Sequence, residues 1–376
     1  MPRLVALALP GGPRYVDALR RVWDAGDAIA PLDLRLPRAE QARVLAALAP
    51  AAVIEGDGEP RSLPDGAPVE PGDAAVVATS GTTGLPKGVI HTHRSIEASA
   101  LATSAALGVD PATDRWLACL PLAHIGGLAV VMRSLVSGTP VEVHDGFDAD
   151  AVLDAAGRGA TLVSLVTRAL NQIPADAFRA VLIGGAAPPP DRPSNVIATY
   201  GMTETGSGVV YERRALDGVE IDIDDGGEIR LRGPMLFRAY RHDPDPFAPG
   251  GWFPTGDLGR WGEDGRLVVD GRRGDVIVTG GEKVWPTRIE ALLGDLADVA
   301  EIALVGRPDP DWGHRVVAVV VPTDPEQPPT LDDLRAITRQ EFPAWCAPRQ
   351  LELRSALPRT SLGKIRRDLL TRPDPT

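Results

Sequence analysis

Short apolar runs alternate with amphipathic stretches over about the first 200 residues of the chain. Met1 to Ala8 is the first apolar stretch, and Pro10-Gly11-Gly12 ends it with a turn. Runs typical of buried strands follow at 74–78, 116–120, 141–144, 162–166, 180–183 and 196–199. Apolar residues at helical spacing predict helices at 95–107, 128–136 and 149–156. This alternation predicts an α/β fold whose sheets are covered and mainly parallel.

After Gly218 the pattern changes to short alternating strands separated by glycine turns. The turns are Asp225-Gly226-Gly227 and Asp264-Gly265, which are typical of hairpins. The predicted strands are 219–223, 228–231, 266–269 and 275–278. We therefore expect a β-rich subdomain over about 218–273.

The last hundred or so residues predict a small α+β domain. Its elements are a helix that Pro286 opens and that ends at Leu293, strands at 300–305 and 316–321, and a helix at 331–342. We place the main domain boundary near residue 273, between an N-terminal domain, 1–273, and a mobile C-terminal domain, 274–376.

Composition limits the possible partners. The net charge of −12 argues against nonspecific binding to nucleic acid. No run approaches the roughly 18 apolar residues of a membrane span, and the early stop at Pro10 disfavours a signal peptide. Cys119 and Cys346 have no metal-ligand spacing and suggest a reducing compartment. We expect a cytoplasmic protein that does not insert into a membrane. The sequence does not decide whether it forms a homodimer.

The segment 79–88, Thr-Ser-Gly-Thr-Thr-Gly-Leu-Pro-Lys-Gly, has a composition suited to holding phosphate. Its glycines let backbone N–H groups approach an anion, its hydroxyls add donors, and Lys87 adds a mobile positive charge. Because Pro86 precedes the lysine and Gly88 follows it, the segment is not a Walker A loop. The alternative is a Gly/Ser/Thr surface linker.

Four further segments carry candidate chemistry. Tyr200 to Thr205 follows a predicted strand, where Glu204 can hold Mg²⁺ beside a phosphate and Tyr200 can stack on a base. Asp257 ends a glycine-rich run and can accept ribose hydroxyls. Segment 271–275, GRRGD, suits a hinge, and Lys364 follows a glycine turn. Taken singly, these residues are also typical of a helix cap, a turn, a linker and a surface lysine.

Together and in this order, the five segments resemble the adenylate-forming superfamily of acyl-CoA synthetases, luciferases and peptide-synthetase adenylation domains. The resemblance covers about 74–370. It implies that a carboxylate attacks the α-phosphorus of ATP to give an acyl-adenylate, after which the C-terminal domain rotates and a thiol attacks. It also implies ATP, Mg²⁺ and CoA as cofactors or co-substrates and a small-molecule carboxylic acid as substrate.

The resemblance assigns roles residue by residue. Lys364 would bridge the carboxylate and the α-phosphate, and Glu204 would bind Mg²⁺. The residues that would hold the nucleotide and line the thiol path are Ser80, Gly81, Thr82, Thr83, Gly84 and Lys87 for phosphate, Gly184, Gly185, Tyr200 and Thr203 for the adenine and magnesium motif, Asp257 and Arg272 for ribose, and Gly280 and Gly281 for the thiol.

The chain departs from the family pattern in three places. Gly274 stands where an aspartate or lysine hinge is usual, which frees the backbone and removes a side-chain contact. The chain before the phosphate segment is short, so we expect part of the usual N-terminal subdomain to be missing. Segment 166–170 replaces a common proline-threonine pair in the substrate-pocket wall.

Segments 121–128, 131–135 and 200–208 look most like the o-succinylbenzoate–CoA ligases of menaquinone biosynthesis. By that similarity His124 would lie at the acyl pocket and gate the carboxylate. Arg133 and Arg168 are candidates for binding a second substrate carboxylate, although either can also lie on a solvated helix face. Another aryl- or acyl-CoA ligase, a peptide-synthetase adenylation domain and a non-catalytic nucleotide-binding regulator are the alternatives.

Overall fold

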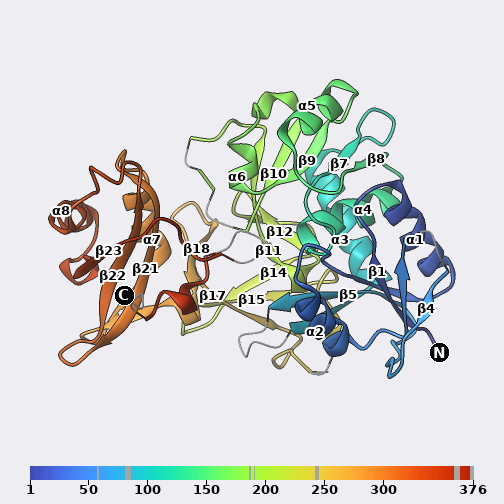
Figure 1. Ribbon diagram of the computed structural model, residues 1–376, viewed down its shortest axis with the longest axis horizontal. Coiled ribbons are helices and arrows are strands. Elements are labelled where there is room, and N and C mark those ends of the chain that lie inside the picture. The colour runs from blue at the N-terminus through green and yellow to red at the C-terminus, as the bar shows by residue number, and fades with distance from the viewer. Residues whose placement is uncertain are drawn as a thin grey trace. The chain divides into compact units, whose positions relative to one another are not determined.

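The computed structural model contains two compact units (Figure 1), residues 1–221 with 231–253 and residues 222–230 with 254–376. The structure describes residues 1–56, 59–80, 86–185, 188–189, 191–241, 245–359 and 365–372. The boundary near residue 273 stays a prediction. Among the described helices, none has both the length and the apolar character that crossing a membrane requires.

The first sheet has parallel pairs at its centre and antiparallel pairs toward its edges. Its strands, in spatial order, are β16 (Ala239–Tyr240), β6 (Pro86–Thr92), β5 (Asp73–Ser80), β2 (Ala28–Pro31), β1 (Leu4–Ala8), β3 (Ala52–Glu55) and β4 (Arg61–Ser62). Helices α1 (Pro13–Asp24) and α2 (Arg38–Leu48) belong to the same region. Pro13 opens α1, and Tyr15, Leu19 and Val22 recur at helical spacing on its buried side.

The second sheet is parallel except at the edge where β12 and β13 pair. Its strands, in spatial order, are β13 (Arg214–Ala215), β12 (Ser207–Tyr211), β11 (Val196–Met202), β10 (Ala180–Ile183), β9 (Leu162–Leu165), β7 (Trp116–Ala118) and β8 (Val141–Val143). Its helices are α3 (His93–Leu107), α4 (Ile125–Ser137), α5 (Ala149–Gly157) and α6 (Thr167–Leu170). Figure 1 shows α5 and α6 on one side of this sheet and α3 and α4 on the other. The predicted alternation of strands and helices is confirmed here.

A four-stranded sheet forms the β-rich part of the chain. Its order is β14 (Glu220–Ile223), β15 (Glu228–Arg232), β17 (Phe253–Trp261) and β18 (Leu267–Arg272). Gly227 and Gly265 adopt left-handed backbone angles in the two predicted hairpin turns, with φ of 82° and 68°. The predicted strand at 275–278 begins later than expected, because residues Arg273–Asp275 form a 3₁₀ turn.

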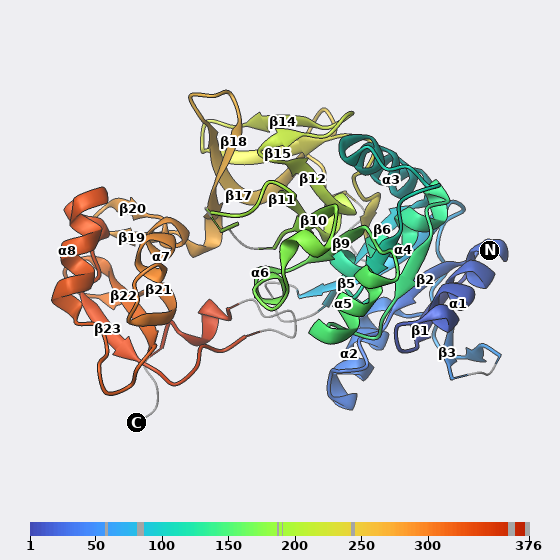
Figure 2. The ribbon, with the colours of Figure 1, turned by 90° about the horizontal axis from the view of Figure 1, so that it is seen from above.

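The C-terminal α+β unit is built on a five-stranded sheet. The strands are β20 (Glu282–Val284), β19 (Ile277–Thr279), β22 (Gly313–Pro322), β21 (Val299–Asp309) and, paired with β22, β23 (Gln350–Leu353). Helices α7 (Pro286–Gly294) and α8 (Leu331–Glu341) cover one face, where Ile289 and Leu334 join the core (Figure 2). Alternate residues of β22, such as Val317, face Leu357 and Leu370 on the other side.

Candidate active site

A hairpin carries the candidate phosphate segment. Strand β5 ends at Ser80, and β6 pairs with it in the register Thr79 with Lys87 and Ser80 with Pro86. Strand pairing therefore fixes the backbone at residues 79–80 and 86–87. The predicted phosphate residues Gly81, Thr82, Thr83 and Gly84 and the predicted catalytic residue Lys364 lie outside the described residues.

One tyrosine ring joins the predicted phosphate lysine to the predicted metal ligand. The Nζ atom of Lys87 lies 4.9 Å from the centre of the Tyr240 ring. The Tyr240 hydroxyl donates a hydrogen bond of 2.9 Å to Oε1 of Glu204. Tyr240 reaches both because β16 pairs with β6, which places it opposite Val89. The structure thus brings Lys87 and Glu204 to the same side chain.

The turn that carries Glu204, Thr203–Thr205, is held by a buried histidine. Nε2 of His91 lies 2.7 Å from the backbone carbonyl oxygen of Thr203. A carbonyl only accepts, so Nε2 carries the hydrogen and donates it. Burial lowers the pKa of His91 to about 4, and the hydrogen bond to Thr203 opposes that shift without cancelling it. His91 is therefore neutral near pH 7 and ties β6 to the Glu204 turn.

Glu204 suits a magnesium ion chemically. Mg²⁺ in proteins is commonly held by one or two carboxylates, with substrate phosphates and water completing its oxygen ligands. The hydrogen bond from Tyr240 goes to Oε1, and Oε2 is the other oxygen of this half-buried carboxylate. Across the part of the chain that the structure describes, no three His, Cys, Asp or Glu side chains gather into a metal cluster.

Two predicted adenine-site segments lie beside each other, one after the end of β10 and the other within β11. Gly184 follows β10, and Thr199 on β11 donates a hydrogen bond of 3.0 Å from Oγ1 to the Ile183 carbonyl. A Cβ atom at position 184 would lie 2.8 Å from that hydroxyl, so only glycine fits without a shift. Gly185 follows with a φ of 83°, and Tyr200 is the next residue along β11. Gly184 and Gly185 therefore lie beside the part of β11 that carries Tyr200.

His124 contacts an acid that sequence analysis does not single out. It stands directly before α4, and its Nε2 lies 3.3 Å from Oδ2 of the buried Asp33. Burial disfavours the charged form of Asp33, but hydrogen bonds from Arg35 and the nearby charges of Arg35 and His124 outweigh it. The pKa of Asp33 is therefore below its usual value. An ionised Asp33 is well placed to orient the His124 ring.

The two candidate arginines differ sharply in environment. Arg168 is exposed on α6, whereas Arg133 is 2% exposed in the middle of α4. The Arg133 guanidinium lies 4.9 Å from the Trp116 ring, and its Nη2 reaches Ser207 Oγ at 3.5 Å. Within the described residues, its Nε and Nη1 contact no hydrogen-bond acceptor. Arg133 is thus a buried cation that has no charged partner among the described residues.

In the second unit, the predicted ribose residues form an ion pair. Asp257 on β17 faces Arg272 on β18, and Arg272 Nε lies 2.8 Å from Asp257 Oδ1. Arg272 also donates from Nη1 to the Thr255 carbonyl at 3.0 Å. Asp257 is 6% exposed, and its backbone N–H donates to Thr255 Oγ1 at 3.0 Å. The carboxylate is therefore held in one orientation.

The glycines at the predicted hinge and thiol path have different physical roles. Gly274 lies in the 3₁₀ turn, and a Cβ atom there would meet no atom within 4 Å. Gly280 has a φ of 59°, donates its N–H to the Trp312 carbonyl at 2.9 Å, and leaves 2.7 Å between an added Cβ and the Trp312 ring. Gly281 completes the same turn with a φ of 84°. Only the 280–281 turn requires glycine.

Comparison with known proteins identifies the family of this chain. The model of the AMP-binding enzyme family matches residues 55–241, and that of the AMP-binding enzyme C-terminal domain matches residues 288–364. A Mycobacterium tuberculosis protein named probable 2-succinylbenzoate–CoA ligase is 42% identical over 326 residues, covering 80% of this chain and 84% of its own. The chain belongs to the AMP-binding enzyme family.

Two further proteins that resemble this chain are informative. Indoleacetate–CoA ligase of Aromatoleum aromaticum is 36% identical over 362 residues, covering 83% of this chain and 69% of its own. The Bacillus subtilis o-succinylbenzoate CoA synthetase, solved with its acyl-adenylate intermediate, has a TM-score of 0.87 and 27% identity. That alignment covers 99% of this chain and 88% of the synthetase chain.

Three residues that contact predicted site residues carry no clear sequence signal. Tyr240 lies in a two-residue strand, 36 positions from Glu204. His91 resembles an ordinary strand residue, and Asp33 lies in a segment without regular structure. In this family the motifs identify residues expected to touch the nucleotide, whereas these three neighbours become visible only when the strands are paired.

Proposed function

We propose that this chain is an AMP-forming acid–CoA ligase that activates o-succinylbenzoate. In the first step a carboxylate oxygen bonds to the α-phosphorus of ATP, and the bond to pyrophosphate breaks. In the second step the CoA sulfur bonds to the acyl carbon, AMP leaves, and the thiol proton is released. The relatives named 2-succinylbenzoate–CoA ligase support this reaction.

The described side chains fit the demands of the first step. Lys87 supplies a positive charge for nucleotide phosphate, and the Asp257–Arg272 pair presents an oriented carboxylate to ribose hydroxyls. When bound at Glu204, Mg²⁺ would neutralise phosphate charge. A solved complex of the Bacillus subtilis synthetase contains ATP and a magnesium ion, which supports the same ligands for this chain. Lys364 would stabilise charge where the two anions meet.

The observation that carries the substrate proposal is the buried Arg133. Its buried Nε and Nη1 groups find no acceptor among the residues that the structure describes, which is costly for a guanidinium, and a bound carboxylate would relieve that cost by charge and by hydrogen bonds. o-Succinylbenzoate has one carboxylate to activate and another on its ring. Arg133 lies beside Ser207, just after the Glu204 turn, so the ring carboxylate is the partner we propose. Arg168, being exposed, is the weaker candidate.

The experiment is a thioester assay with four acids, o-succinylbenzoate, 4-oxo-4-phenylbutanoate, benzoate and octanoate. We expect the first to be preferred, and Arg133→Met to reduce its kcat/KM by about 100-fold, in line with loss of a buried charged contact. The same variant should change kcat/KM for 4-oxo-4-phenylbutanoate little, because that acid lacks the ring carboxylate. Arg168→Met is the matched control. Preference for another acid by the wild-type chain would overturn the assignment.

The runner-up is an aryl-CoA ligase with a different acid, for which the similarity to indoleacetate–CoA ligase is the specific support. We also propose that residues 274–376 rotate as a C-terminal domain about Gly274 and carry Gly280 and Gly281 toward the thiol. A cytoplasmic location fits the buried free cysteines Cys119 and Cys346. Sedimentation analysis tests the homodimer that the sequence leaves open.

A further inference from the structure

Glu228, a residue of β15, contacts the turn that carries the predicted ribose acid Asp257. Its Oε1 atom accepts a hydrogen bond of 2.9 Å from the backbone N–H of Gly256. Gly256 has a φ of 73°, in the left-handed region that favours glycine. A buried backbone N–H needs an acceptor, and the Glu228 side chain, which is only 12% exposed, supplies one here. A second turn of the chain thus depends on this carboxylate.

Three side chains fix the backbone of the turn. Glu228 accepts from the Gly256 N–H, and Thr255 Oγ1 accepts from the Asp257 N–H at 3.0 Å. Arg272 donates from Nη1 to the Thr255 carbonyl, also at 3.0 Å. Thr255 and Arg272 belong to the segments that sequence analysis singles out, whereas Glu228 belongs to the neighbouring hairpin. The orientation of the Asp257 carboxylate therefore depends on a residue outside its own motif.

The hairpin turn before β15 sets the position of Glu228. Gly227 has a φ of 82°, and the Glu228 N–H donates to Asp224 Oδ1 at 2.8 Å. Ile229, the next residue, is fully buried in the core. Since successive side chains of a strand point to opposite faces, Glu228 points to the other face of the sheet. This placement directs its carboxylate to the Gly256 turn.

The second oxygen of the same carboxylate contacts the predicted hinge. Arg273 Nη2 lies 2.8 Å from Glu228 Oε2, and Arg273 stands directly before Gly274. Arg273 is half exposed, so solvent screens this ion pair more than it affects the contact with Gly256. One carboxylate thus has one oxygen on the ribose turn and the other on the residue before the hinge.

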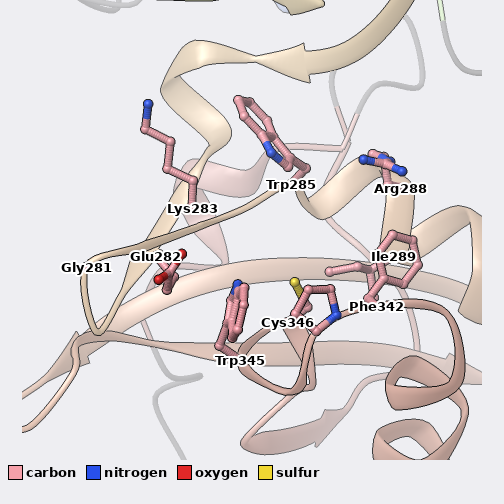
Figure 3. A pocket seen from close by; sticks show the side chains of 10 residues that line it. Gly281, Glu282, Lys283, Trp285, Arg288, Ile289, Phe342, Trp345 and Cys346 are labelled. Carbon is pink, nitrogen blue, oxygen red and sulfur yellow. The ribbon is translucent and has the colours of Figure 1, made fainter. Parts of the chain in front are cut away.

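Strand β18, which carries Arg272, also packs against α7. A Cβ atom added to Gly271 would lie 3.2 Å from Thr287 Oγ1. Figure 3 shows Trp285 and Arg288 at this end of α7, beside a pocket that lies between α7 and the loop after α8. The strand therefore connects the ribose pair with the first helix of the predicted C-terminal domain.

We propose that Glu228 is a positioning residue for ribose recognition. It holds the Gly256 turn so that the Asp257 carboxylate faces the ribose hydroxyls, and its contact with Arg273 links that turn to the hinge. The inference rests on the proposed function, in which ATP is bound through its ribose at Asp257. An acceptor that is already oriented binds a hydroxyl at lower entropic cost than one that must be ordered on binding. Loss of Glu228 should therefore weaken the ribose contacts and leave those of the phosphates unchanged.

The experiment compares ATP with 2′,3′-dideoxy-ATP, which lacks both ribose hydroxyls, in the release of pyrophosphate. Wild-type protein should have the lower KM for ATP. Glu228→Ala should raise KM for ATP about tenfold, the size of one lost hydrogen bond to a charged acceptor, and leave KM for 2′,3′-dideoxy-ATP and for the acid unchanged. Glu228→Gln keeps an acceptor and should restore most of the preference for ATP. Arg273→Met should raise KM for ATP by about two- to threefold, because its ion pair is exposed.

The coupling to Asp257 can be measured directly. In protein that already carries Asp257→Ala, Glu228→Ala should have no further effect on KM for ATP. Glu220→Ala is the matched control, because it removes an ion pair of 2.5 Å with Arg232 on the same sheet that does not involve the Gly256 turn. It should leave KM for both nucleotides at the wild-type value. If Glu228→Ala does not fold, Arg273→Met provides the same comparison with Glu228 in place.

Two results would overturn the role of Glu228. One is an equal rise in KM for ATP and 2′,3′-dideoxy-ATP in Glu228→Ala, which a merely structural role would produce. The other is a wild-type KM for ATP in that variant. A wild-type chain that releases no pyrophosphate with any acid would instead overturn the proposed function.

Discussion

Replacing Tyr240 by phenylalanine tests whether the contact between this side chain and Glu204 matters for magnesium. The change removes the hydroxyl that donates to Glu204 Oε1 at 2.9 Å and keeps the ring that faces Lys87 at 4.9 Å. A hydrogen bond to a charged acceptor contributes about 1.5 to 3 kcal/mol. Both side chains are half-buried, so we take the lower end. That value is roughly a tenfold effect.

The effect should be seen in the magnesium dependence of the first step. We expect Tyr240→Phe to need about tenfold more Mg²⁺ for half-maximal pyrophosphate release, because the Glu204 carboxylate loses one of its fixed contacts. Tyr240→Leu removes the ring as well. It should add a loss of about 0.5 to 1 kcal/mol from the contact with Lys87, visible as a higher KM for ATP.

The control is Tyr211→Phe. The Tyr211 hydroxyl lies 3.2 Å from Thr103 Oγ1 in the interior, so this variant also loses a buried hydroxyl contact but does not touch Glu204. It should change thermal stability without changing the magnesium dependence. The reasoning is refuted if Tyr240→Phe has a wild-type magnesium requirement, or if it binds Mg²⁺ more tightly.

Three other predictions concern Lys364, His91 and the glycine at position 280. Lys364→Ala should abolish pyrophosphate release yet still convert supplied acyl-adenylate and CoA to thioester; unchanged turnover from acid and ATP would contradict the role of Lys364. The pKa of His91 is about 4 in the folded protein and about 6.5 in the unfolded chain. The neutral His91 side chain therefore makes its full contribution to the free energy of unfolding above pH 6.5. That contribution is lost as the pH falls toward 4. Urea unfolding at pH 7 and pH 5 should therefore show wild type losing about 2 kcal/mol more than His91→Gln, and parallel losses would refute this. Gly280→Ala should lower the free energy of unfolding by about 1 to 3 kcal/mol, because the added methyl group would meet the Trp312 ring and the backbone φ is 59°. Gly274→Ala is the control and should stay within about 0.5 kcal/mol of wild type in the same urea assay.

The sequence pattern predicts those elements whose burial is purely apolar. Strand β10 is found at its predicted bounds, Ala180–Ile183, because all four of its side chains are buried. Strand β17 is not predicted, because Thr255 and Asp257 occupy buried positions in it. A hydrogen bond to the Ile229 carbonyl and the ion pair with Arg272 stabilise these polar groups, and both partners are distant in sequence.

In the N-terminal region, the sequence pattern predicts only some of the helices and strands. Pro13 and the spacing of Tyr15, Leu19 and Val22 are sequence signals of α1. Strands β2 and β3 end in Pro31 and Glu55, residue types that are uncommon in strands, so their pattern is ambiguous.

For the candidate site, sequence motifs predict residue roles through the family resemblance, and the structure supplies their neighbours. The sequence of α4 does not show whether Arg133 is buried or exposed to solvent, because its apolar neighbours Val131 and Met132 are compatible with both environments. Burial beside Trp116 and Ser207 depends on how α4 packs against two distant strands. That packing is what separates Arg133 from Arg168.

The most direct test of the account follows oxygen atoms through the reaction. Wild-type protein would be given o-succinylbenzoate labelled with ¹⁸O in its carboxylates, together with ATP, Mg²⁺ and CoA, and the products would be analysed by mass spectrometry. If the acid attacks the α-phosphorus, each thioester formed should be matched by one AMP that carries one ¹⁸O atom. Label in inorganic phosphate, ADP as the product, or thioester formed with unlabelled AMP would contradict the adenylate-forming mechanism.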